Sequence, residues 1–150
     1  MSKNKPNDAC PTPQPQDDEE VRQLLSSIKN IAVVGMSSKP HRPSRGVGLY
    51  LDKHGFNVIP VHPRETEIEG MKVYADLETI PEDIHIDLVD LFVSGEPTVN
   101  IVEQAANIGP PAVWFQPGAE HQPAIERAKQ LGLKVICGRC AMADHARLFD

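Results

Sequence analysis

The sequence predicts an α/β fold, in which helices cover both faces of a five-stranded, mainly parallel sheet. Five short apolar runs have the length and composition of buried strands, at residues 31–34, 57–61, 87–93, 112–116 and 133–137. Helical patterns alternate with these runs along the chain. Strands that alternate with helices in this way pair in parallel, and ligands then bind at the carboxyl edge of the sheet.

Composition indicates one cytoplasmic domain of 150 residues, with a formal charge of 15 − 21 = −6. This charge argues against a nucleic-acid or anionic-membrane partner. No stretch approaches the roughly 18 apolar residues of a membrane span, and the first residues lack the apolar core of a signal peptide. Residues 1–16 carry four prolines among polar residues, which predicts a disordered tail before a folded domain over 17–150.

The first predicted helix begins with the acidic run 17–20, which suits a helix N-terminus. Val21, Leu24, Leu25 and Ile28 then follow at i, i+3, i+4 and i+7, and form the apolar stripe that a core-facing helix needs. The strand at 31–34 comes next. It is apolar throughout, as expected of a strand buried on both faces.

The turn after this strand is the strongest functional signal. Gly35 ends the strand, Ser37 and Ser38 offer hydroxyls, and the basic residues of the turn precede a helix expected to begin near Pro43 or Ser44; these basic residues are Lys39, Arg42 and Arg45. A helix N-terminus surrounded by cations suits an anion. An ordinary turn with solvated basic residues is the alternative. The dinucleotide fingerprint is incomplete, because Ser37 replaces its second glycine.

The end of the second strand distinguishes between nucleotide ligands. An NAD site places an acid there to bind the ribose hydroxyl, whereas this chain has His62, Pro63 and Arg64. Arg64, with His62, would suit an additional phosphate on the ribose, as in coenzyme A or NADP. A surface arginine after a turn proline is the alternative interpretation.

The rest of the chain completes the alternation. An extended piece at 72–74 and a helical turn before Pro81 precede the third strand, and Ser94 to Pro97 open a helix. The strand at 112–116 leads through Pro117 and Gly118 to a helix whose buried side includes Ala124, Ile125, Ala128 and Leu131. The strand at 133–137 closes the sheet.

Several runs resemble a known family, the small stand-alone CoA-binding proteins related to the CoA-binding domain of the succinyl-CoA synthetase alpha subunit. The resemblance covers about residues 20–149 and rests on V-V-G-M-S-S-K-P-x-R-P-S, V-I-P-V-H-P-R, D-L-V-D-L-F-V, V-W-F-Q-P-G and G-R-C-A-M-A-D-H-A-R-L. It implies a three-layer Rossmann-like fold that binds coenzyme A. His62 and Pro117 differ from the residues usual in that family.

The resemblance also implies which residues contact coenzyme A. They lie at the ends of the first four strands and in the turns that follow: Gly35, Ser37, Ser38, Arg42, Ser44, Pro63, Arg64, Phe92, Val93, Ser94, Gln116 and Gly118.

A binding protein is favoured over an enzyme. A CoA ligase would need a phosphorylated histidine and a nucleotide-binding partner domain, for which 150 residues leave no room, and His121 is interpreted as a surface residue. Asp87 and Asp90 lie within a predicted strand and receive no catalytic role. The expected function is therefore to carry or sense coenzyme A or an acyl-CoA, or to serve as a partner subunit. An NADP-binding, oxidoreductase-like domain is the alternative, and the protein partner and oligomeric state stay open.

Cys137 and Cys140 form a C-x-x-C pair after the last strand. Such a pair can be redox-active at a helix N-terminus, or can bind a metal together with His145. Both interpretations are weaker than a structural role, because three ligands are one short of a closed zinc site and most cysteines of this kind pack as small apolar residues. An odd total of three cysteines also fits a reducing compartment. No metal site is predicted.

Overall fold

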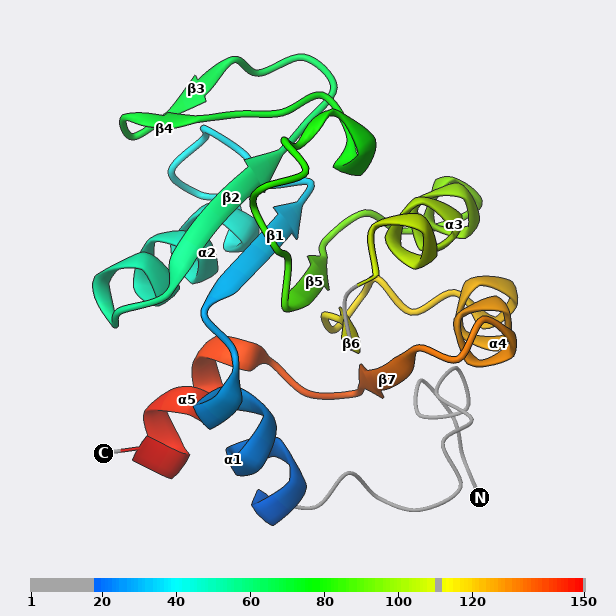
Figure 1. Ribbon diagram of the computed structural model, residues 1–150. Helices are drawn as coiled ribbons and strands as arrows, with labels where there is room; N and C mark the ends of the chain where they lie inside the picture. Colours follow the sequence, from blue (N-terminus) through cyan, green and yellow to red (C-terminus); the bar gives the residue numbers. More distant parts are fainter. Residues whose placement is uncertain (1–17, 110–111, 150) are drawn as a thin grey trace.

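The computed structural model describes residues 18–109 and 112–149, so the predicted tail at 1–16 lies outside the described residues (Figure 1). Its helices are α1 (Asp18–Ser27), α2 (Pro43–Lys53), α3 (Pro97–Ile108), α4 (Gln122–Gln130) and α5 (Ala141–Phe149), with a 3₁₀ turn, η2, at Leu77–Thr79. The main strands are β1 (Asn30–Val34), β2 (Asn57–Val61), β5 (Leu88–Leu91), β6 (Ala112–Phe115) and β7 (Lys134–Cys137). A small hairpin joins β3 (Glu67–Ile68) and β4 (Met71–Lys72).

The five main strands form one parallel sheet in the order β2-β1-β5-β6-β7, which confirms the predicted fold class. β1 pairs with β2 on one side and with β5 on the other. The chain therefore builds the sheet outward from β1 in one direction and then crosses to the opposite side. In sheets of this kind the reversal leaves a crevice at the carboxyl ends of the two central strands, here β1 and β5.

Helices cover both faces of the sheet (Figure 1). One face packs Val33, Trp114 and Ile136 against buried residues of α1, α2 and α5. The opposite face packs Ala32, Val113 and their neighbours against α3 and α4. This arrangement is the three-layer α/β architecture expected of strands that are apolar on both sides.

The free edge of the sheet is closed beside β2. Pro60 lies in this edge strand, where its missing N–H costs no ladder bond to β1. Tyr74 donates its backbone N–H to the Pro60 carbonyl and accepts from His62, at 3.0 and 2.9 Å. The extended piece predicted at 72–74 thus exists in part as β4 and in part as this bridge.

In the described part of the chain, no helix is long and apolar enough to cross a membrane.

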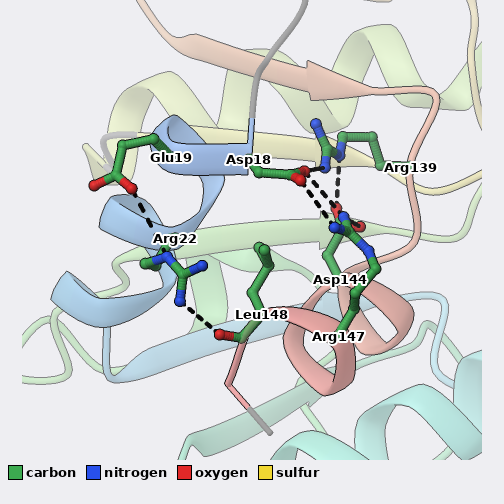
Figure 2. Close-up of polar contacts among 7 residues, drawn as sticks. All are labelled: Asp18, Glu19, Arg22, Arg139, Asp144, Arg147 and Leu148. Atoms are coloured by element: carbon green, nitrogen blue, oxygen red, sulfur yellow. Dashed lines mark hydrogen bonds and ion pairs between the residues drawn. The ribbon is translucent and has the colours of Figure 1, made fainter.

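An ion-pair network ties α1 to α5 (Figure 2). Asp18 binds Arg147 through both carboxylate oxygens, at 2.9 and 3.0 Å, and binds Arg139 at 2.7 Å. Asp144 joins the same two arginines, at 2.6 and 3.1 Å. Arg22 adds a hydrogen bond to the carbonyl of Leu148 at 2.6 Å. The Arg147 and Arg139 guanidinium groups hold the pKa of Asp18 well below its usual range.

We expect Asp18→Asn to loosen α1, because an amide loses the charge-assisted bonds to both arginines. Backbone amides of α1 should exchange hydrogen several-fold faster, as measured by mass spectrometry, and the effect should shrink at high salt. Glu19→Gln is the matched control, since the contacts of Glu19, with Arg22 at 3.8 Å and Gln23 at 3.3 Å, both lie within α1. Equal exchange in the two variants would contradict a role for the network.

Candidate functional site

A cavity of about 850 Å³ opens at the carboxyl edge of the sheet, and we call it the edge cavity. Its size is in the range of small-molecule sites. The ends of β1, β2, β5 and β6, the first turn of α2 and the segment after β7 form its walls. The lining residues are Gly35, Ser37, Lys39, Arg42, Pro43, Ser44, Val47, His62, Arg64, Glu65, Phe92, Gln116, Pro117, Gly118 and Cys140.

Gly35 shapes the floor of the edge cavity. Its φ is +89°, a conformation that side chains rarely adopt, and its N–H donates to the Val61 carbonyl at 2.8 Å. A Cβ at this position would lie 2.9 Å from Cγ2 of Val93. The chain can therefore leave β1 and turn across β5 only because residue 35 is a glycine.

Two hydrogen bonds to serine hydroxyls hold the turn between Gly35 and α2. The Ser44 hydroxyl accepts the backbone N–H of Ser37, and the Ser37 hydroxyl accepts that of Lys39, each at 3.0 Å. Arg42 is the N-cap of α2 but its side chain makes no capping hydrogen bond. The helix begins at Pro43, as predicted, and Pro43 has no N–H. The N–H groups of Arg45 and Gly46 donate to the Arg42 carbonyl, so the positive dipole end of α2 and the N–H of Ser44 are what the helix N-terminus offers the cavity.

The end of β2 contributes a second cationic region. His62 uses Nδ1 to accept the backbone N–H groups of Arg64 and Glu65, at 3.0 and 3.2 Å. This ring nitrogen therefore holds the loop that carries Arg64, and the other ring nitrogen is the one left for a ligand. Arg64 itself is exposed and lines the edge cavity.

The ends of β5 and β6 form the most buried part of the wall. Gln116 is 1% exposed, and its Nε2 donates to Oδ1 of Asp90 at 2.6 Å. Asp90 is fully buried in β5, and desolvation raises its pKa to about 7, against the lowering effect of the Gln116 hydrogen bond. Asp90 has no role that the sequence predicts, because an acid within a strand has no local partner that marks it.

The structure brings most of the predicted contact residues together. Eight line the edge cavity: Gly35, Ser37, Arg42, Ser44, Arg64, Phe92, Gln116 and Gly118. Four others lie outside the lining: Ser38, Pro63, Val93 and Ser94. The hydroxyl of Ser38 donates to Glu65 at 2.6 Å, and Val93 packs beside Gly35.

Three lining residues were missed from the sequence, which are Val47, Glu65 and Cys140, whereas Pro117 lies within the predicted turn from Gln116 to Gly118. Val47 lies one turn into α2 on the same face as Ser44, so helical periodicity could have indicated it. Cys140 is a free thiol at the start of α5, and no local pattern places that segment beside α2. Among residues 18–109 and 112–149, no three potential ligands gather as a metal site would need.

These features define the class of the protein, a Rossmann-like α/β protein with a ligand cavity at the carboxyl edge of its sheet. The chain belongs to the CoA-binding domain family, whose model matches residues 29–146.

Relatives of known sequence and structure support this assignment. The chain is 33% identical to the uncharacterised protein YneT of Bacillus subtilis over 127 residues, 85% of this chain and 93% of that protein. A hypothetical protein from Pyrococcus horikoshii superposes with a TM-score of 0.87 at 38% identity, over the full length of both chains. The alpha subunit of an ADP-forming acetate–CoA ligase from Pyrococcus furiosus is 28% identical over 80% of this chain and 29% of the subunit.

We expect Gly35→Ala to lower the free energy of unfolding by about 1–2 kcal/mol, because a Cβ is strained at this φ and crowds Val93. Gly46→Ala is the control. Gly46 lies inside α2 with open space around its Cβ position, so alanine there should stabilise by about 0.5–1 kcal/mol. Urea denaturation measures both, and equal effects would show that Gly35 is not required by the turn.

Burial of Asp90 predicts a specific dependence of stability on pH. Its pKa is about 7 in the folded protein and lower in the unfolded chain, so the folded state binds the extra proton between these values. The Asp90 contribution is therefore fully present only below the unfolded pKa of 3.8, and it is lost as the pH rises from there to about 7. Asp90→Asn should remove this loss, and should be more stable than the parent at pH 8 by about 1–4 kcal/mol, relative to the difference at pH 4. Urea denaturation across this range checks the sign. A difference that does not change with pH would contradict it.

Proposed function

We propose that the edge cavity binds coenzyme A or an acyl-CoA. The observation that carries this proposal is the gathering of cations and the N-terminus of α2 around one cavity of a chain whose net charge is negative. Membership of the CoA-binding domain family supports it. Coenzyme A has a pyrophosphate, a separate ribose phosphate and a neutral arm, and the cavity offers a matching wall for each.

The order of the strands suggests how the ligand lies. The pyrophosphate would occupy the N-terminus of α2 beside Gly35, Ser37 and Arg42. The ribose phosphate would pair with Arg64 at the end of β2. The pantetheine arm would then run in the opposite direction, past Phe92 on β5 to Gln116 on β6.

We infer a role in carrying or sensing coenzyme A, or as the CoA-binding partner of separate catalytic subunits. The likeness to a ligase alpha subunit supports the last of these, because this chain matches only 29% of that subunit. An NADP-binding oxidoreductase is the second candidate. The observation that favours this candidate is that Arg64, a cation, stands where NAD sites place an acid, and a cation there would also suit the ribose phosphate of NADP.

Arg64→Ala should weaken CoA binding by roughly ten- to a hundredfold, because a charge-assisted hydrogen bond contributes about 1.5–3 kcal/mol. Dephospho-CoA should bind the parent that much more weakly than CoA, and the variant should lose most of this preference. Calorimetric titration measures all four affinities.

Lys53→Ala is the matched control, since Lys53 is an exposed cation at the far end of α2. It should leave every affinity unchanged. NAD and NADP complete the ligand set, and tighter binding of either than of CoA would replace the proposal with the oxidoreductase alternative.

A further inference from the structure

Gln116 is held in the wall of the edge cavity by its backbone. Its N–H donates to the Leu91 carbonyl at 3.1 Å, and its carbonyl accepts from Ala119 at 2.8 Å. Its side chain is 1% exposed and also lines the cavity. The one side-chain hydrogen bond of Gln116 in the described residues is the bond from Nε2 to Asp90.

Asp90 determines which way the Gln116 amide faces. An ionised carboxylate only accepts hydrogen bonds, so the amide must turn its NH₂ group toward Asp90. The 2.6 Å bond from Nε2 to Oδ1 is in this orientation. The second oxygen of Asp90, Oδ2, is buried and has no partner within the described part of the chain. A fully buried acid with one satisfied oxygen is costly to keep for packing alone.

We propose that Asp90 is a positioning residue that fixes the carbonyl oxygen of Gln116 toward the edge cavity, where this oxygen accepts a hydrogen bond from an amide N–H of the pantetheine arm. This inference rests on the proposed binding of coenzyme A. It assigns Gln116 the selection of ligands that carry a hydrogen-bond donor at this point.

The dimensions of the sheet agree with this contact. Gln116 follows β6, which is two strand positions from β1, or roughly 10 Å at about 4.8 Å per strand. The pantetheine arm has about twelve bonds between the pyrophosphate and the sulfur, the length of four extended residues, or roughly 14 Å. An arm that starts at the Gly35 turn therefore places its amide groups, which precede the sulfur, within reach of Gln116.

Protonation of Asp90 would release this orientation. A neutral carboxyl group can accept from Nε2 or donate its O–H to Oε1 of Gln116, so the amide can then also turn its NH₂ group to the cavity. Since burial raises the pKa of Asp90 to about 7, the change falls near neutral pH.

Burial, and not a charged neighbour, accounts for the raised pKa of Asp90. Its neighbours in the sheet, Val33 and Trp114, are apolar. Four charged or titratable groups on the helices covering this face have partners elsewhere: Arg45 with Glu69, Asp144 with Arg139 and Arg147, His145 with Tyr50, and Glu20 with Lys134. The others on these helices are exposed: Asp18, Glu19, Arg22, Asp52, Lys53 and Arg147. The titratable groups of the cavity wall are Lys39, Arg42, His62, Arg64, Glu65 and Cys140. Burial and the Gln116 bond are the influences on the pKa of Asp90.

The test compares two ligands, CoA and adenosine 3′,5′-bisphosphate, which lacks the arm. Asp90→Leu removes the acceptor and keeps nearly the same shape, so nothing then holds the NH₂ group of Gln116 away from the cavity. CoA affinity at pH 8 should then fall by about ten- to a hundredfold, while affinity for the bisphosphate stays the same. Gln116→Met, which keeps the volume but removes the acceptor, should act in the same way.

The pH profile separates positioning from a merely structural effect. CoA affinity of the parent should fall as the pH drops from 8 to 6, and that of Asp90→Leu should not change by this route. Asp87→Asn is the control, because Asp87 lies at the opposite end of β5 and accepts the backbone N–H groups of Lys29 and Asn30 at 2.9 Å. Circular dichroism confirms that each variant folds.

The outcomes are distinct. If the parent binds CoA and Asp90→Leu binds it equally well, with the same pH profile, the positioning role is wrong and the proposed function stands. Loss of CoA affinity in Gln116→Met alone also overturns the role of Asp90. If the parent binds neither ligand, the proposed function itself is wrong.

Discussion

Parallel pairing of β1 with strands on both sides is the constraint on which the site depends. It brings the carboxyl ends of all five strands to one edge, and it leaves a crevice where the chain reverses direction. Residues from position 35 to position 140 meet there because of this pairing alone. Apolar side chains on both faces of the strands pack the sheet between its helices, and this packing supports the edge that carries the site.

The electrostatics of the site are local. The chain carries a formal charge of −6, yet Lys39, Arg42 and Arg64 line one cavity beside a helix N-terminus. Two acids of the same region bind groups of the protein itself. Glu65 accepts from Ser38, and Glu69 pairs with Arg45. A positive region thus persists on a negative protein.

The sequence predicted those features that depend on neighbours along the chain. The range 57–61 matches β2, and the turn with its helix start at Pro43 was predicted from glycine, serines and basic residues. The third strand was predicted at 87–93 but spans Leu88–Leu91. At its start, the carboxylate of Asp87 accepts the backbone N–H groups of Lys29 and Asn30. At its end, the chain bends after Phe92 toward Gly95, which has a positive φ. The contact between Asp90 and Gln116 could not be predicted from the sequence. It joins two strands across 26 residues, and neither residue has a local pattern that indicates the other.

The ion pairs between α1 and α5 have a topological consequence. They place the start and the end of the described fold side by side, on the face of the sheet away from α3 and α4 (Figures 1 and 2). A circular permutant that joins these ends through a short linker would keep every strand pairing. New ends could open at the tight β3–β4 turn, where Glu69 and Gly70 both have positive φ and no main-sheet strand is interrupted. Continuity of the backbone between α5 and α1 would then replace the salt-sensitive contacts that now hold the two helices together.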